Sequence, residues 1–572
     1  MKKKMLKLLI ITMAVAGIMC VMAPSVFATP LNQIPKDEVV ADVRTEAQFK
    51  AAIRDRNVTY IRVLANITLK KNDATYTINE NKRKLTIDGS GANDTLRTYT
   101  LSENPGNAGI GCAQIAVRNS NVRFNQITVK NINLNGSQEL GIIHISCDCK
   151  NRVNVLFDNV DYAGPALAVA YGALSSNSVT VKDSKIALNP RLSRCNRSSE
   201  AVAARFIFIE GNVEITKENS IDNDDYNEIF RLLYKNSQLV VKSGANLTVN
   251  NYADPSTHRA KSTAASEYSG LIGTSLTSCD TSSVVFEAGS YTYYSGYGPI
   301  AEDIGRCDSC LSQLYMVTLQ DDATLEIETL SSGITKSYNR PYFHNSFFDA
   351  REFRLDTNSS LYYTFTGAMN KGEKLMSFNK LTVGEGARLY VAAPQNRQAE
   401  TVVALEEANA SVTINNPYHV IFYNGKETAP SYALKNDEKV RDQSISVAAK
   451  SIKLWDIGTL EGEVDIRPSD ERWDIYDTNF NIWMGATVED DPVLGPTVTS
   501  QDFAFAAILS RDNAKTGGTH ILGTPRVELA PGSVLLSGKY PNVGPAPYPM
   551  KTLYNRNILE INGNDYPGGI VW

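Results

Sequence analysis

A pattern of paired apolar residues that repeats down the middle of the chain constrains the fold more than any other feature. Each copy has two apolar residues separated by one other residue, then a gap of five mostly polar or small residues, and then a second apolar pair of the same form. The four clear copies begin at Leu239, Val317, Phe353 and Leu381. Alternation on each side of the gap predicts short strands that bury every second side chain. The Gly, Asp, Ser and Asn residues of the gap are typical of turns.

A fifth and weaker copy lies between the first two. It has Ser283 in the first apolar place, then Val285, and Tyr291 and Tyr293 after the gap. Counted from 239, 283, 317, 353 and 381, the copies are 44, 34, 36 and 28 residues apart. Such spacing is expected when each copy is one supersecondary unit stacked on the next.

Two architectures are compatible with this pattern. Ordinary hairpins in a β-sandwich would also alternate, but a further apolar stretch between copies, such as 375–378, supplies a third strand per repeat. We therefore predict an all-β chain whose middle forms a parallel β-helix. An N-terminal cap is expected: residues 45–48 have the spacing of a capping box, and Phe49, Ala52 and Ile53 form a helical apolar stripe.

The first 28 residues have the features of a secretory signal peptide. Four lysines precede the apolar run 8–15, and Val26-Phe27-Ala28 suits cleavage. Its removal leaves 53 Lys+Arg against 62 Asp+Glu, a net charge of −9, which argues against a nucleic-acid partner. The rest of the chain has no apolar run long enough to span a membrane. The predicted organisation is a signal peptide at 1–28, a linker at 29–41, the β-helix at 42–417, and a β-rich C-terminal part at 418–572, in one domain or two.

Seven cysteines remain after cleavage of the signal, which removes Cys20. Export to an oxidising compartment favours disulfides, and the odd number leaves one thiol unpaired or joined to another chain. Zinc binding by Cys147-x-Cys149 together with Cys307-x-x-Cys310 is the alternative. The disulfide candidates are Cys112, Cys147, Cys149, Cys195, Cys279, Cys307 and Cys310.

Four segments, taken in order, resemble the pectate lyase-like adhesive domain of Gram-positive surface proteins, and the resemblance covers about residues 40 to 425. The resemblance implies a right-handed parallel β-helix on a bacterial surface with a role in adhesion, and it supplies no catalytic residues. The segments are Val43-x-Thr45-x-x-x-Phe49-x-x-Ala52-Ile53, Leu85-Thr86-Ile87-Asp88-Gly89, Glu200-Ala201-Val202-Ala203 with 206–210, and Asn416-Pro417 with 420–423.

The C-terminal part offers no clear means of attachment to the cell. Wall-binding relatives have Trp-x-Leu motifs, but here Ile replaces Leu in Trp455-Asp456-Ile457 and Trp473-Asp474-Ile475. The simpler interpretation is that these tryptophans fill a small β core. A sortase-type LPxTG signal is absent, so covalent anchoring is not expected. We expect a secreted, extracellular protein, with non-covalent association with the cell wall as an open alternative.

A cluster of tyrosines is the candidate ligand-binding surface. Tyr291, Tyr293, Tyr294 and Tyr297 lie within seven residues, and tyrosine offers apolar area together with a hydroxyl for contact with glycans or proteins. Trp473, beside several acids, is a further candidate for stacking on a sugar. The alternative for the tyrosines is that every second one faces inward. The predicted partner is a host or bacterial surface glycan or protein.

An enzymatic alternative is a calcium-dependent polysaccharide lyase or glycoside hydrolase acting on uronides. Its metal site would be Asp222, Asp224 and Asp225, since Ca²⁺ prefers clustered carboxylates. The same residues fit a solvated loop between rungs, and no cofactor other than Ca²⁺ is suggested. The five histidines are scattered, so no catalytic residue is assigned. A surface-layer component without a ligand is a third possibility.

Overall fold

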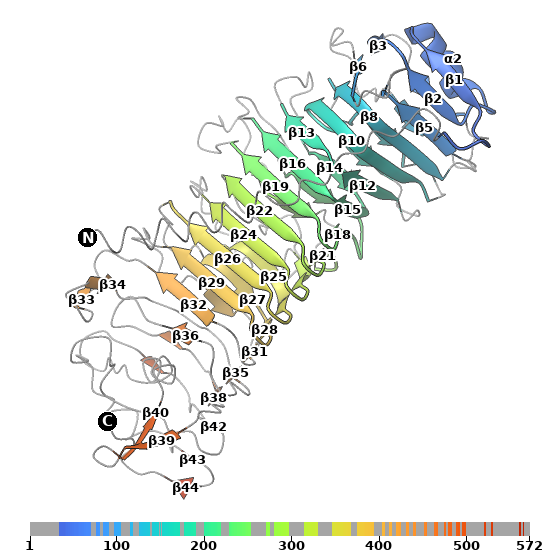
Figure 1. Ribbon diagram of the computed structural model, residues 1–572. Helices are drawn as coiled ribbons and strands as arrows, with labels where there is room; N and C mark the ends of the chain where they lie inside the picture. Colours follow the sequence, from blue (N-terminus) through green and yellow to red (C-terminus); the bar gives the residue numbers. More distant parts are fainter. Residues whose placement is uncertain are drawn as a thin grey trace, which may run out of the picture.

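The computed structural model is a long stack of short parallel strands with a helix at its N-terminal end (Figure 1). Strands of successive turns pair along three ladders, so each turn, or rung, has up to three faces. The structure describes residues 34–393 except 70–75, 80–83, 91–96, 104–114, 118–124, 138–139, 148, 150–151, 172–176, 190–199, 219–227, 253–269, 275–279, 297–313, 330–345 and 368–373; after residue 393 it describes the strands alone.

The first face is a continuous parallel ladder. Its strands pair in order from the helix end of the molecule, and two long strands, β8 and β10, contribute only their N-terminal halves. The strands are β1 (Val40–Val43), β2 (Tyr60–Val63), β5 (Lys84–Asp88), β8 (Gln126–Asn135), β10 (Asn154–Gly164), β12 (Ser178–Lys182), β15 (Phe206–Glu210), β18 (Gln238–Val241), β21 (Ser283–Phe286), β23 (Leu314–Leu319), β25 (Ser346–Leu355), β28 (Lys380–Val383), β31 (Ser411–Ile414), β35 (Ser451–Leu454) and β38 (Asn479–Ile482).

The second face is a parallel ladder of the same kind. The C-terminal halves of β8 and β10 belong to it, so these strands turn the corner between the two faces. Its other strands are β3 (Ile67–Leu69), β6 (Thr100–Glu103), β13 (Lys185–Leu188), β16 (Asn212–Lys217), β19 (Asn246–Asn251), β22 (Tyr291–Gly296), β24 (Thr324–Thr329), β26 (Ser360–Phe365), β29 (Arg388–Ala393), β32 (His419–Asn424) and β36 (Glu463–Ile466).

The third face consists of shorter strands. Seven of them form one parallel sheet, and a second group begins with the N-terminal half of β25. The strands are β4 (Tyr76–Thr77), β7 (Ile115–Val117), β9 (Ile143–Ile145), β11 (Ala168–Ala170), β14 (Val202–Ala204), β17 (Phe230–Leu232) and β20 (Ile272–Thr274), then β27 (Lys374–Phe378) and β30 (Val403–Leu405).

Parallel pairing continues past residue 417 to β38, so an end of the ladders does not mark the predicted boundary there. The division at 417 therefore stays a prediction. The remaining strands pair locally, as two antiparallel hairpins, one parallel pair and a three-stranded group. They are β33 (Ser431–Ala433), β34 (Lys439–Arg441), β37 (Asp474–Ile475), β39 (Val488–Asp491), β40 (Gly495–Val498), β41 (His520–Ile521), β42 (Glu528–Leu529), β43 (Glu560–Ile561) and β44 (Asn564–Asp565).

The apolar residues of the repeat form the core. Leu247, Leu325, Leu361 and Leu389 lie in one inward column of the second face, and each is at most 1% exposed. In the part of the chain that the structure describes, every pairing between 239 and 391 is parallel. The predicted parallel β-helix is therefore confirmed and the sandwich is excluded, while the handedness of the coil stays a prediction.

The predicted N-terminal cap is present as α2 (Glu46–Arg54). The Thr45 side chain accepts a hydrogen bond from the Gln48 N–H, and the Gln48 side chain accepts one from the Arg44 N–H. Phe49, Ala52 and Ile53 are buried, as their spacing predicts. The helix thus covers apolar side chains that the first rung would otherwise expose to water.

The corner between the first and second faces repeats one backbone conformation. In nine successive rungs its middle residue has a positive φ between 47° and 68°, a region that favours Gly, Asn and Asp. This explains the turn-forming residues in the five-residue gap. The residues are Asn131, Asn159, Asp183, Gly211, Gly244, Gly289, Asp322, Asn358 and Gly386.

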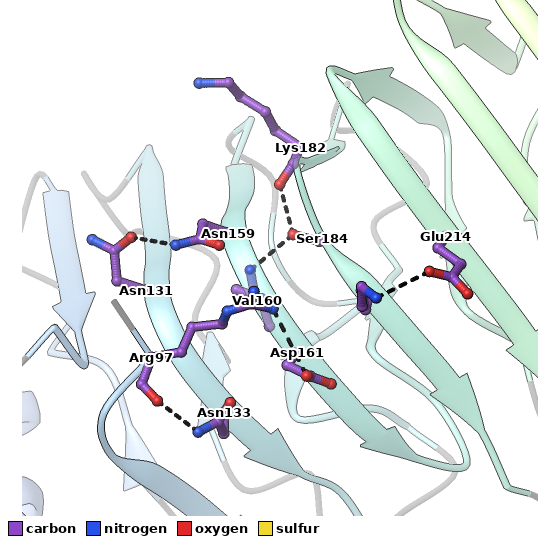
Figure 2. Close-up of polar contacts among 10 residues, drawn as sticks. Arg97, Asn131, Asn133, Asn159, Val160, Asp161, Lys182, Ser184 and Glu214 are labelled. Atoms are coloured by element: carbon purple, nitrogen blue, oxygen red, sulfur yellow. Dashed lines mark hydrogen bonds and ion pairs between the residues drawn. The ribbon is translucent and has the colours of Figure 1, made fainter. Parts of the chain in front are cut away.

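Polar side chains link neighbouring rungs at the first of these corners (Figure 2). The Asn159 amide donates to Asn131 at 2.9 Å, and the Ser184 hydroxyl accepts from the Val160 N–H at 2.9 Å. The Ser184 hydroxyl in turn donates to the carbonyl oxygen of Lys182 at 2.6 Å. The two bonds of Ser184 satisfy backbone groups where the chain leaves one ladder and enters the next.

The predicted register of the weak repeat copy is wrong by one residue. Val284 pairs with Leu239, and Thr292 pairs with Leu247, so Thr292 and Tyr294 face inward while Tyr291 and Tyr293 face outward. The sequence misled because Thr292 is polar yet fully buried.

Candidate functional site

Four tyrosines and two glutamates gather on the outward side of the second face. The backbone register stacks Tyr293, Glu326, Tyr362 and Tyr390 in one column over four successive rungs. Tyr291 lies two residues before Tyr293 on β22. Tyr291 is 36% exposed and the other tyrosines are half-buried. We call Tyr291, Tyr293, Glu326, Glu328, Tyr362 and Tyr390 the Tyr–Glu patch.

Hydrogen bonds hold two tyrosines of the patch against its carboxylates. The Tyr291 hydroxyl donates to Glu326 at 2.8 Å, and the Tyr293 hydroxyl donates to Glu328 at 3.2 Å. Partial burial raises the pKa of both phenols, and the neighbouring carboxylates raise the pKa of each phenol further. Both tyrosines therefore stay protonated at neutral pH.

The two carboxylates of the patch differ from most other outward acids of the described β-helix in their partners. Among the described residues, no lysine or arginine forms an ion pair with Glu326 or Glu328. Both carboxylates are partly exposed, and a carboxylate can accept several hydrogen bonds, including those from hydroxyl, amide or ammonium groups of a ligand.

Outward residues on the first face are arranged differently. One column alternates acidic and basic residues over seven successive rungs, and we call it the charge ladder. Three pairs of neighbouring residues in this column form ion pairs: Arg62–Asp42 at 2.7 Å, Lys130–Asp88 at 3.5 Å and Lys182–Asp158 at 3.6 Å. The ladder consists of Asp42, Arg62, Asp88, Lys130, Asp158, Lys182 and Glu210.

The predicted ligand-binding residues divide by position. Tyr291 and Tyr293 are on the surface, whereas Tyr294 is fully buried and its hydroxyl accepts a hydrogen bond from the Asn251 amide at 3.1 Å. Tyr294 therefore lies in the core and not on the predicted binding surface. Tyr297 and Trp473 lie outside the described residues.

The predicted calcium site of Asp222, Asp224 and Asp225 also lies outside the described residues. Within the described residues, no group of three His, Cys, Asp or Glu side chains is placed to hold a metal ion. The calcium site therefore stays a prediction.

Two of the seven predicted disulfide cysteines are described. Cys147 is exposed, Cys149 is buried, and no disulfide bond joins these two. The Cys149 thiol donates a hydrogen bond to the carbonyl oxygen of Val117 at 3.2 Å. Cys112, Cys195, Cys279, Cys307 and Cys310 lie outside the described residues, so the disulfide pattern stays a prediction.

Sequence reasoning missed Glu326, Glu328, Tyr362 and Tyr390. Each lies in a clear repeat copy or directly after its apolar pair, at an outward position. Aligning the copies by their gaps, with the gap of the weak copy moved by one residue to 287–291, stacks Glu326, Tyr362 and Tyr390 with Tyr293. The signal was present, but it became visible only after the register of the weak copy was corrected.

The architecture and the site together define an elongated β-helix with an aromatic and acidic surface patch. Residues 40–169 match the family model described as "Putative pectate lyase-like adhesive domain". The family predicted from the sequence is thereby confirmed for these residues, which include the capping helix and the first rungs. The matched segment ends before the Tyr–Glu patch begins.

Two solved structures are similar to this chain. One, "L. reuters 100-23 SRRP", has 13% identity and a TM-score of 0.39, with 67% of this chain and 99% of that chain covered. The other, "L. reuteri 53608 SRRP", has 16% identity and a TM-score of 0.29, with 65% and 98% covered. No curated protein matches the sequence. Within the described residues, we find no helix with the length and apolar character needed to span a membrane.

Proposed function

We propose that the chain is a secreted, surface-associated adhesin in which the β-helix is a stalk and the Tyr–Glu patch binds a surface glycan. The adhesive-domain match supports the general role. The signal-like N-terminus supports an extracellular location.

The observation that carries the assignment to this patch is its combination of partly exposed tyrosine rings and carboxylates that have no basic partner among the described residues. In the charge ladder, by contrast, ion pairs join acidic and basic residues of neighbouring rungs. In the patch, Glu326 and Glu328 accept hydrogen bonds from tyrosine hydroxyls instead.

The chemistry of the patch suits a glycan. Tyrosine rings can pack against the apolar faces of sugar rings, and the carboxylates can accept hydrogen bonds from sugar hydroxyls. The sheet holds these side chains at fixed spacing, so little conformational entropy is lost on binding. The acidic patch, on a chain of net negative charge, favours a neutral or basic glycan over a polyuronide.

Retention of the purified protein on immobilised glycans and on whole cells tests the proposal. We expect Tyr293→Ala to weaken retention at least tenfold, a loss typical of a central aromatic contact. Tyr315→Ala removes a tyrosine that is 43% exposed and lies on a first-face strand, β23, so it is the matched control.

The outcomes separate three possibilities. Retention by proteins but not by glycans would keep the adhesive role and replace the ligand class. Equal retention of the Tyr293→Ala and Tyr315→Ala variants would place binding away from the patch. If the unmodified protein is retained on no surface, a purely structural surface-layer component is the better description.

A further inference from the structure

The first face carries a row of uncharged, mostly apolar side chains on its outward side, and the proposed function does not use it. The strands β10, β12, β15, β18 and β21 lie side by side along the stack (Figure 1). One residue of each strand faces outward, because the residues before and after it in the chain are buried in the core. We call these five residues the apolar stripe: Leu156, Thr180, Phe208, Val240 and Val285.

The apolar stripe is part of a wider uncharged surface. Val240 is 5% exposed and the other four residues are half-buried. The next outward column on one side is also uncharged over the same rungs. Contiguous outward surfaces of this composition commonly mark contacts with another macromolecule. The residues of that column are Asn154, Ser178, Phe206, Gln238 and Ser283.

The charge ladder borders the apolar stripe on its other side, two residues further along each strand. Its alternation of acid and base continues past Glu210, because Lys242 and Glu287 directly follow the next two strands and form an ion pair at 2.8 Å. The side chains of Asp158, Lys182 and Lys242 are 31%, 39% and 36% exposed, so a second molecule can reach them.

This surface is complementary to itself in one arrangement. When two copies pack face to face about a two-fold axis that runs along the strands, stripe meets stripe and ladder meets ladder, with the order of the rungs reversed. If the axis lies between two rungs, each acidic residue faces a basic one, because the sign alternates from rung to rung. A two-fold axis along the stack would instead bring each rung against the same rung, so the ladder would meet its own sign or the uncharged column.

We propose that two copies of this chain form an antiparallel dimer through the apolar stripe, about an axis between the rungs of Lys182 and Glu210. Lys182 then faces Glu210 of the second copy, and Asp158 faces Lys242, each contact being made twice by symmetry. These charges select the antiparallel order of the rungs.

The apolar side chains form the centre of the same contact. Leu156 then packs against Val240 of the second copy, and Thr180 packs against Phe208. Removal of these side chains from water stabilises the dimer. The Tyr–Glu patch lies on the second face, so the dimer and the proposed glycan binding are tested by separate variants.

Sedimentation equilibrium of the purified protein over a range of concentrations tests the proposal. We expect a reversible dimer. Phe208→Asp places a carboxylate in the apolar centre and should raise the dissociation constant of the dimer at least tenfold. Tyr293→Ala, an outward change on the second face, is the control and should leave the dissociation constant unchanged. A protein that stays monomeric at every concentration, or a dimer that Phe208→Asp leaves intact, would overturn the proposal.

Two charge variants test the antiparallel order of the rungs. Lys182→Glu and Glu210→Lys each place like charges opposite each other twice in the dimer, so each variant alone should be largely monomeric. An equal mixture of the two should form dimers again, because every acidic residue of one variant then faces a basic residue of the other. Both variants keep the apolar stripe, so the mixture decides the question even if Phe208→Asp does not fold. Failure of the mixture to dimerise, when the unmodified protein does, would contradict the antiparallel arrangement.

Discussion

The charge ladder and the Tyr–Glu patch both consist of outward residues of one β-helix, on its first and second faces, but their charged side chains have different partners. In the ladder, each acidic residue has a basic residue opposite it in a neighbouring rung. In the patch, Glu326 follows Tyr293 and Glu328 follows Ser295 in the preceding rung, and both carboxylates accept hydrogen bonds from tyrosine hydroxyls. Both columns are fixed by the same backbone pairing, so the difference lies in the side chains alone.

This difference indicates two roles for outward residues of a solenoid. Alternating charges favour one pairing of rungs, since a shift by one rung would place like charges opposite each other. Carboxylates without a basic partner in the described rungs add nothing to that selection. This contrast supports our proposal that the patch contacts a ligand.

The largest expected effect comes from the buried part of the ladder. Asp88 is 5% exposed. It accepts a hydrogen bond from the Tyr60 hydroxyl and forms an ion pair with Lys130. Asp88→Ala leaves both partners without an acceptor, and we expect a loss of about 4 kcal/mol in the free energy of unfolding, measured with urea.

Two matched variants show whether the loss of stability arises because Asp88 is buried, or whether removal of any outward carboxylate causes a similar loss. Asp158→Ala removes a partly exposed carboxylate of the same ladder, and Glu326→Ala removes one from the patch. Both should cost less than about 1 kcal/mol. A loss at Glu326 as large as that at Asp88 would show that the patch is part of the structural framework after all.

The sequence was sufficient to predict the ladders but not their outward surfaces. Period-two apolar pairs and a turn-forming gap predicted inward columns such as Leu247 and Leu325, because burial acts on each residue directly. The capping helix followed from the local spacing of Thr45, Gln48 and Phe49. Both predictions rest on residues that are near one another in the chain.

The patch depends on register between distant rungs. Tyr293 and Glu326 are adjacent in space only because the gap of each repeat places its third residue at the corner, at Gly289 and Asp322. A polar residue at an inward position, Thr292, was enough to move the weak copy by one residue and to turn the tyrosines inward. Outward positions accept polar and apolar residues alike, so the residues near Thr292 in the sequence gave no reason to correct the register of the weak copy.

The second prediction concerns Glu200, a buried residue that belongs neither to the charge ladder nor to the Tyr–Glu patch. Burial raises the pKa of Glu200 to about 7 from the ordinary 4.5, so the folded state binds this proton more tightly than the unfolded state. The contribution of Glu200 to stability is therefore greatest below pH 4.5, falls as the pH rises from 4.5 to 7, and then changes no further. The total change approaches about 3 kcal/mol.

The measurement is the urea midpoint across this pH window for the unmodified protein and for Glu200→Gln. The difference between the two curves isolates Glu200, because other titrating groups contribute equally to both. The variant should lack the decline, while Asp158→Ala, in the exposed ladder, should keep it. Parallel curves for the unmodified protein and Glu200→Gln would contradict the assignment of the raised pKa to Glu200.

The smallest expected effect reverses one charge in each region. Lys182→Glu places a carboxylate between Asp158 and Glu210, so three acidic residues follow one another along the ladder. We expect a loss of about 1 kcal/mol in the free energy of unfolding, reduced by added salt because these groups are exposed. Glu326→Lys should leave stability unchanged within about 0.5 kcal/mol but abolish retention on the glycan. If both reversals lower stability to the same extent, or if neither does, the two regions do not differ in the way that their side chains indicate.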